Sequence, residues 1–294
     1  MKVLVTGATG FIGKQVVQFL QGLGRCHVLT SARNEERLKQ LGADYIVYDL
    51  NEEPNHCYER LGRPEVLIHL AWEGLPHYQE SFHLDWNLIN NYRFLRSMVE
   101  QGLPSITVTG TCYEYGLQNG CLQEEMLTNP TTSYGIAKDV LRRRLAALQE
   151  KHPFRLRWLR LFFMYGPGQP DRTLMAQVDQ ALAAWRETFD MSGGEQLRDY
   201  LPAAEVAALI AKVALQTRHD GIFNICSGQP ISVRRLVEEH IAAKRGRLRL
   251  NLGVYPYPAH EPMAFWGDPA RMRFAVTSFE EEQKETAPPL KAVI

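Results

Sequence analysis

The sequence predicts an α/β protein built on a doubly wound parallel sheet, and three observations support this fold class. Apolar segments of strand length alternate with longer amphipathic segments through the first two thirds of the 294 residues. The first apolar segment runs into a glycine-rich turn at residues 7–13, which opens the first amphipathic segment. No apolar run approaches the roughly 18 residues that a membrane-spanning helix requires. Strand–helix alternation of this kind places helices on both faces of a parallel sheet, in a Rossmann-type arrangement.

The apolar patterns also predict the individual elements. Continuous apolar runs, typical of strands buried on both faces, lie at residues 2–5, 26–30, 45–48, 66–70, 105–109 and 156–163. Amphipathic stretches between them predict helices at 12–23, 34–41, 82–101 and 133–151. Ligands of such sheets bind beyond the carboxyl ends of the strands, so we expect the functional residues there.

After about residue 165 the sequence becomes richer in turns. Glycine- and proline-containing pieces separate helical patterns at 173–187, 203–216 and 232–245. We therefore predict a dinucleotide-binding domain over residues 1–165 and a smaller α/β substrate-binding region over residues 166–294, partly interwoven with the first. The final stretch, 278–294, is charged and then proline-bearing, and we expect it to be poorly ordered.

Composition excludes several classes of function. Hydrophobic residues make up 45% and charged residues 22%, which is ordinary for a globular protein. The net charge of +0 argues against general attraction to nucleic acid or to a membrane. Five irregularly spaced cysteines form neither a disulfide framework nor a metal-ligand pattern. The N-terminus lacks a signal-peptide pattern. We expect a cytoplasmic enzyme with free thiols and no metal.

The glycine-rich turn is the candidate phosphate site. Glycines allow backbone N–H groups to approach a pyrophosphate, whose charge is favoured at a helix N-terminus. The strand before the turn and the amphipathic helix after it indicate dinucleotide binding. The expected contacts come from Gly7, Thr9, Gly10, Phe11, Ile12 and Gly13.

The second strand indicates which dinucleotide binds. An NAD site usually has an acidic residue about 20 residues after the glycines, at the end of this strand. Residues 29–34 contain no carboxylate, whereas Ser31 and Arg33 offer donors for a 2′-phosphate. This favours NADPH/NADP over NADH. The alternative is NADH, with Glu35 as the missing acid in a shifted register. Asp49, followed by Leu50, is placed to accept a hydrogen bond from the adenine amino group.

Tyr134 and Lys138 form the candidate catalytic pair. Residues at i and i+4 of a helix share a face, so the two side chains lie together. A fixed ammonium beside a phenol favours phenolate, which brings a tyrosine pKa of about 10 nearer to neutral pH. The pair therefore predicts a proton donor.

Together with further motifs, these residues resemble the extended short-chain dehydrogenase/reductase family, which includes sugar-nucleotide epimerases, dehydratases and ketoreductases. The resemblance extends over nearly the whole chain, to about residue 275. The additional matching segments are His69-Leu70-Ala71, Asn87, residues 109–116, Arg160-Leu161-Phe162, residues 165–168, Arg198-Asp199-Tyr200 and residues 223–228.

The resemblance implies roles for residues of these motifs. Thr111 would hold the substrate oxygen, Tyr134 would donate the proton, and Lys138 would bind the nicotinamide ribose and lower the tyrosine pKa. Cofactor contacts are also expected from Leu70, Ala71, Trp72, Asn87, Thr109 and Phe162. Substrate contacts are expected from Trp72, Glu73, Tyr113, Phe163 and Arg198, with Arg198 on the diphosphate of a sugar nucleotide. Phe163 replaces an asparagine that is frequent in the family.

Departures from the family pattern narrow the reaction. The 4,6-dehydratases have Asp-Glu after the catalytic threonine, where this chain has Cys112 and Tyr113, so dehydration is disfavoured. Reductases that also epimerise ring carbons have a cysteine two places after the catalytic residue. Cys112 is one place early, which puts its thiol on the other side of an extended backbone, and we interpret it as a packing residue.

The segments at 71–78 and 110–116 look like those of the 4-ketoreductases of deoxysugar biosynthesis. The expected activity is NADPH-dependent reduction of a dTDP-linked 4-keto-6-deoxyhexose, with dTDP-fucose as the first-choice product, in deoxysugar or O-antigen biosynthesis. The alternatives are a reductase forming dTDP-6-deoxytalose or a CDP-deoxysugar, an NAD-dependent 4-epimerase, and a non-catalytic NADPH sensor or scaffold. Helices 82–101 and 133–151 match those that pair in family homodimers, so a homodimer is expected.

Overall fold

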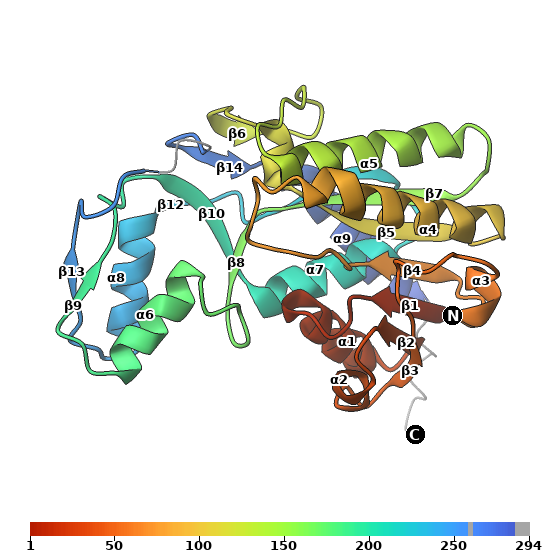
Figure 1. Ribbon diagram of the computed structural model, residues 1–294, viewed down its shortest axis with the longest axis horizontal. Coiled ribbons are helices and arrows are strands. Elements are labelled where there is room, and N and C mark those ends of the chain that lie inside the picture. Colours follow the sequence, from red (N-terminus) through yellow and green to blue (C-terminus); the bar gives the residue numbers. More distant parts are fainter. Residues whose placement is uncertain (258–260, 286–294) are drawn as a thin grey trace, which may run out of the picture.

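The computed structural model describes residues 1–257 and 261–285, and its centre is a seven-stranded sheet. The strand order is β11-β7-β5-β4-β1-β2-β3, and every neighbouring pair is parallel (Figure 1). This arrangement confirms the predicted Rossmann-type sheet. The strands are β1 (Lys2–Thr6), β2 (His27–Ala32), β3 (Asp44–Val47), β4 (Val66–His69), β5 (Ser105–Thr111), β7 (Arg155–Leu161) and β11 (Gly221–Ile225).

Helices cover both faces of this sheet (Figure 1). On one face α3 (Cys57–Arg60), α4 (Leu88–Glu100) and α5 (Ser133–Gln149) bury an apolar cluster against the strands. On the other face lie α1 (Phe11–Leu23), α2 (Glu35–Lys39), α7 (Ala203–Leu215) and α9 (Ala270–Glu285). A single π-helical turn, His83–Asn87, leads into α4, so the helix expected over residues 82–101 has two geometries. Within the described residues, no helix is both long and apolar enough to cross a membrane.

A smaller lobe extends from one end of the sheet (Figure 1). Its helices α6 (Leu174–Ala183) and α8 (Val233–Ala243) share an apolar core that includes Met175, Phe189 and Val237. Its strands form a three-stranded sheet and two parallel pairs. They are β8 (Phe163–Tyr165), β10 (Leu197–Pro202) and β12 (Pro230–Ser232), then β9 (Thr188–Asp190) with β13 (Arg249–Asn251), and β6 (Gly120–Leu122) with β14 (Phe265–Gly267).

The chain passes repeatedly between the two parts. The strand expected over residues 156–163 ends at Leu161, and Phe163 already belongs to β8 of the small lobe. Later, β11 returns to the edge of the large sheet beside β7, and α7 packs against α1. The apolar patterns did not predict β11. The domain boundary at residue 165 stays a prediction.

The expectation for the C-terminal stretch is wrong over residues 278–285, which are the last part of α9. This part of the helix is ordered because its acidic side chains bind basic and polar groups of the preceding segments. Glu280 pairs with Lys212 at 2.7 Å, and Glu282 accepts hydrogen bonds from the Thr217 backbone and hydroxyl. The acidic side chains that suggested disorder therefore hold the end of α9 against the preceding segments. Residues 286–294 lie outside the described residues.

Candidate active site

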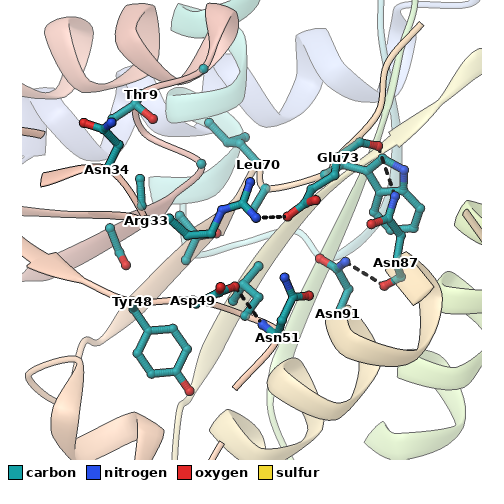
Figure 2. Close-up of a pocket in the computed structure, with 18 of the residues that line it drawn as sticks. Thr9, Arg33, Asn34, Tyr48, Asp49, Asn51, Leu70, Glu73, Asn87 and Asn91 are labelled. Carbon is teal, nitrogen blue, oxygen red and sulfur yellow. Dashed lines mark hydrogen bonds and ion pairs between the residues drawn. The ribbon is translucent and has the colours of Figure 1, made fainter. Parts of the chain in front are cut away.

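A groove of about 510 Å³ opens beyond the carboxyl ends of β1, β2, β3 and β4 (Figure 2). This is the edge at which ligands of parallel sheets bind. Eleven of the expected cofactor residues line it, together with Glu73. The eleven are Gly7, Thr9, Gly10, Ser31, Arg33, Asp49, Leu50, Leu70, Ala71, Trp72 and Asn87.

The glycine turn forms the floor of the groove through two close backbone contacts. Gly7 has φ +68°, and a Cβ on it would lie 2.7 Å from the amide nitrogen of Ala71. A Cβ on Gly13 would overlap the carbonyl oxygen of Gly7. Side chains at these positions would separate α1 from β1 and β4, so the turn keeps its shape only with glycine.

The N-terminus of α1 faces this turn without an internal anion. Gly10 caps the helix with no side-chain hydrogen bond, and the first turn contains no acidic residue. Its N–H groups and the positive end of the helix dipole suit a diphosphate. Phe11, Ile12 and Gly13 are not among the residues that line the groove, and their expected cofactor contacts stay predictions. The turn and the helix end therefore fit a dinucleotide.

Arg33 lies at the end of β2, where the adenosine half of a dinucleotide would sit. Its guanidinium pairs with the Glu73 carboxylate at 2.7 Å across the groove, as Figure 2 shows. Arg37, which the sequence analysis missed, is one helical turn further on and also lines the groove. Glu35 pairs instead with Lys39 at 3.0 Å and does not line the groove, so it does not replace the missing acid.

Asp49 lines the groove beyond β3, as predicted (Figure 2). Its Oδ1 accepts a hydrogen bond from the Asn51 amide at 3.0 Å, which closes a turn. Its second carboxylate oxygen has no described partner within the residues that the structure covers. The adenine contact therefore stays a prediction.

Thr111 is held at the end of β5 by a capping box. Its hydroxyl accepts from the Tyr113 amide at 3.3 Å, and its own amide donates to Glu114 at 2.9 Å. Glu114 is fully buried and pairs with Arg160 at 2.8 Å. The segment Thr111–Glu114 therefore has a fixed backbone that presents the hydroxyl beyond the sheet edge.

Tyr134 and Lys138 lie together in the first turns of α5, as predicted. Thr132 caps this helix by accepting from the Gly135 amide at 3.0 Å, and the Tyr134 amide donates to the Tyr78 carbonyl at 2.9 Å. Both side chains are buried. The Thr111 side chain lies close enough to the Tyr134 phenol to act on its pKa. The structure thus brings together the three residues expected to be catalytic.

The Lys138 ammonium lies 5.9 Å from the centre of the Tyr134 ring and has nearer partners. It donates to the Thr109 carbonyl at 2.8 Å and lies 3.9 Å from the centre of the Trp72 ring. Burial lowers the pKa of Lys138 to about 7, against an opposing effect of Glu114. Burial raises the pKa of Tyr134, whereas the Thr111 side chain acts in the opposite direction. Among the described residues, Lys138 is not one of the groups that shift the Tyr134 pKa here, so the expected lowering of that pKa by Lys138 stays a prediction.

His83 holds Trp72 in place and was missed by the sequence analysis. The Trp72 indole donates to Nδ1 of His83 at 3.0 Å, so Nε2 carries the proton and donates to the His77 carbonyl at 3.0 Å. The Asn87 amide lies 3.2 Å from the same Nδ1 and donates to the Glu73 carbonyl at 3.0 Å, so it also holds the segment that carries Trp72. A histidine four residues before Asn87, on the same helical face, was the available signal.

The expected substrate residues Tyr113, Phe163 and Arg198 gather beyond Tyr134, where β8, β10 and β14 approach β5. Tyr78 links them to the catalytic residue, because its ring lies 5.6 Å from Tyr134 and 4.9 Å from Tyr113. Arg198 pairs with Glu261, which no motif had indicated. The alternative pairing of Arg198 with Asp199 is absent from the described ion pairs.

Two further expected residues lie away from the groove. Phe162 packs in an apolar cluster with Tyr115, Cys226 and Phe265, and its cofactor contact stays a prediction. Cys112 is buried in the same cluster, where burial raises its pKa, as expected of a packing residue.

The fold and the groove define a Rossmann-type α/β protein with a dinucleotide-type phosphate turn. The model of the NAD dependent epimerase/dehydratase family matches residues 3–226, and the chain belongs to this family. It is thus a member of an NAD(P)-dependent enzyme family that modifies nucleotide sugars.

Individual relatives agree with this assignment. The chain is 31% identical over 272 residues to a dTDP-6-deoxy-L-talose 4-dehydrogenase (NAD(+)) of Aggregatibacter actinomycetemcomitans, covering 91% of this chain and 99% of the relative. A GDP-6-deoxy-D-talose 4-dehydrogenase of the same organism is 24% identical, with 81% and 78% covered. Among solved structures, MoeE5 in complex with UDP-glucuronic acid and NAD has a TM-score of 0.79 at 24% identity, with 97% and 100% covered.

Proposed function

We propose that the protein is a ketoreductase that acts at C4 of a nucleotide-linked 4-keto-6-deoxyhexose, with NADPH as the reductant. The observation that carries this proposal is the placement of Thr111, Tyr134 and Lys138 together beside a groove with a dinucleotide-type turn. Such a set supplies a proton and holds the oxygen that receives it.

The chain's own residues act on the carbonyl oxygen. When bound, a nicotinamide would supply the hydride. Thr111, at the end of β5, and Tyr134, at the start of α5, are neighbours that hold the oxygen from two sides. Tyr134 gives up its phenolic proton as negative charge develops on that oxygen. A protonated Lys138, whose ammonium lies 5.9 Å from the centre of the Tyr134 ring, stabilises the resulting phenolate.

The cofactor preference is supported by the adenosine end of the groove. Arg33 and Arg37 bring two guanidinium groups to it, and no carboxylate follows β2 directly. Guanidinium groups bind phosphates with matched geometry. The relative named for NAD(+) makes NADH the comparison to test.

The names of the relatives help to choose between the candidate sugar products. A 4-dehydrogenase and a 4-ketoreductase perform the same hydride transfer in opposite directions. The dTDP-6-deoxy-L-talose dehydrogenase therefore favours the talose-type product over dTDP-fucose among the sequence-based alternatives, with dTDP as the nucleotide.

A second candidate is NAD-dependent 4-epimerisation. It is favoured by a UDP-glucose 4-epimerase of Neisseria meningitidis that is 27% identical over 312 residues. An epimerase keeps its NAD through the cycle, whereas a reductase consumes one cofactor per turnover. We also propose a homodimer formed by α4 and α5, which lie side by side on one face (Figure 1).

One experiment tests the reaction. The purified protein is incubated with NADPH or NADH and a panel of dTDP-, GDP-, UDP- and CDP-linked 4-keto-6-deoxy sugars, and products are identified by NMR. We expect stoichiometric NADPH consumption with a dTDP sugar, and loss of turnover with retained NADPH binding in Tyr134→Phe. Epimerised product without net cofactor consumption would establish the second candidate, and full activity of Tyr134→Phe would exclude the proposed acid.

A further inference from the structure

A buried ion pair occupies the inner end of the substrate region. Arg198, on β10, is 2% exposed, and its Nη2 and Nε lie 2.7 and 3.2 Å from Oε2 of Glu261. The other carboxylate oxygen of Glu261 accepts from the Tyr113 hydroxyl at 2.5 Å. A single carboxylate therefore binds both the cation and the phenol donor.

The surroundings make this counter-ion necessary. The Arg198 guanidinium lies 4.5 Å from the centre of the Phe265 ring and 5.8 Å from that of Phe163. Its Nη1 donates to the carbonyls of Leu197 and Met263. These partners are neutral, and a guanidinium surrounded by aromatic rings needs an anion to offset its desolvation. Within the described part of the chain, Glu261 provides that anion.

The pair also lies on the route that leads from the catalytic tyrosine. Tyr134 contacts Tyr78, Tyr78 contacts Tyr113, and Tyr113 binds Glu261. A ligand with its reacting carbon at Tyr134 would therefore extend along these rings toward Arg198. In the proposed reaction, the part of the substrate that extends from the sugar is the diphosphate.

We infer that Glu261 is a displaceable internal anion, which holds Arg198 and Tyr113 until the diphosphate of a nucleotide sugar takes its place. The inference rests on the proposed function in that it takes its ligand class from it. Glu261 thereby acts as a specificity-determining residue, because only a ligand with sufficient negative charge replaces it.

Geometry and charge both support this exchange. The guanidinium fork fits a carboxylate and a phosphate equally, and a phenol donates to either. Two anions cannot share the fork, because like charges at this range repel strongly in a poorly solvated site. The Glu261 side chain is 14% exposed, against 2% for that of Arg198, so the carboxylate is the partner with access to solvent. The exchange therefore moves Glu261 outward and leaves the arginine in place.

This arrangement predicts a selection by charge. A neutral sugar offers nothing to replace the carboxylate, so it leaves the pair intact and binds weakly. A diphosphate brings more charge than the single carboxylate that it displaces. Removing the charge of Glu261 therefore favours any diphosphate ligand, whatever its sugar.

The test measures binding without turnover. Titration calorimetry with dTDP and UDP compares the wild type with Glu261→Gln, and with Glu280→Gln as a control. The control makes the same change in net charge on α9, where Glu280 pairs with Lys212. We expect about tenfold tighter binding to Glu261→Gln and unchanged binding to Glu280→Gln. Equal or weaker binding to Glu261→Gln would overturn the inference.

A second variant keeps the charge. Glu261→Asp shortens the side chain by one methylene, which weakens its hold on Arg198 without removing a carboxylate. We expect its affinity for dTDP to lie between those of the wild type and Glu261→Gln. Affinity equal to or below the wild type in both variants would show that Glu261 only maintains the shape of the region.

The readouts separate this inference from the proposed reaction. Tighter nucleotide binding in Glu261→Gln, without reduction of any 4-keto sugar by the wild type, supports the inference and rejects the ketoreductase. Reduction by the wild type with weakened nucleotide binding in Glu261→Gln supports the ketoreductase and rejects the inference.

Discussion

The ammonium of Lys138 lies 3.9 Å from the centre of the Trp72 indole, and the same indole forms an edge contact with Tyr134 at 5.9 Å. Trp72 therefore contacts both residues expected to move a proton and also lines the cofactor groove. His83 fixes the ring through the indole nitrogen. A single aromatic ring thus contacts both the ammonium and the phenol.

The contact between Trp72 and Lys138 should be measurable as a coupling energy. A buried cation over a partly buried indole is worth about 1 kcal/mol. We expect the variants Trp72→Leu and Lys138→Met, with their combination, to give a coupling of about 1 kcal/mol in a double-mutant cycle of urea unfolding. Strictly additive effects would show that the contact contributes nothing to stability.

The buried Lys138 should make stability depend on pH. Burial lowers its pKa to about 7 from an ordinary value of 10.5. Between these values the unfolded chain binds more protons than the folded one, so stability rises with pH across this window. We expect the wild type to gain about 1 kcal/mol per pH unit relative to Lys138→Met, in unfolding measured at pH 7, 8 and 9. Parallel curves would contradict the lowered pKa.

The Arg33–Glu73 pair should tune the choice between NADPH and NADH. Glu73 neutralises the guanidinium that a 2′-phosphate would use. Glu73→Gln should lower the KM for NADPH about threefold, as expected for a half-exposed charge, and leave that for NADH unchanged. Arg33→Gln should raise the KM for NADPH about tenfold.

Glu35→Gln is the matched control for these cofactor measurements, because Glu35 pairs with Lys39 outside the groove. It should change neither KM. An equal response of NADPH and NADH to both Arg33→Gln and Glu73→Gln would mean that the pair does not recognise the 2′-phosphate.

The buried pair of Glu114 and Arg160 should be a large contributor to stability. Glu114→Gln leaves the guanidinium without its counter-ion, which costs about 3–5 kcal/mol in a buried pair. Glu125→Gln removes an exposed partner of Arg271 and should cost less than about 1 kcal/mol. Denaturant unfolding compares the two, and similar losses would argue against a structural role for Glu114.

The proposed dimer makes a prediction about half-exposed apolar residues. Trp86 and Ile89, each 52% exposed, lie in the π-turn and at the start of α4. Ile89→Glu should convert a dimer into a monomer in light scattering, whereas Trp185→Glu, in the small lobe, should leave it intact. A monomeric wild type would contradict the proposed homodimer.

Local patterns predicted the parts of the site that local sequence determines. The glycine turn needs only seven residues, and the Tyr134–Lys138 face needs only a helix. Glu261 meets Arg198 across 63 positions and Tyr113 across 148, so no periodicity connects them. The contact between the Lys138 ammonium and Trp72 could not be predicted either, because Trp72 lies in a loop whose position depends on His83.

Arg198 and Asp199 are adjacent on β10 and bind different parts of the protein. Arg198 pairs with Glu261 in the substrate region, whereas Asp199 accepts hydrogen bonds from Ser227 and Gly228 and ties down the loop after β11. Successive side chains of a strand point to opposite faces. If one residue were inserted or deleted before Arg198, the two side chains would change faces. The Asp199 carboxylate would then replace the Arg198 guanidinium in the substrate region, and the loop after β11 would lose its hydrogen bonds to Asp199. The number of residues in β10 before Arg198 is thus as constrained as the identities of Arg198 and Asp199. We expect relatives to lack insertions and deletions there.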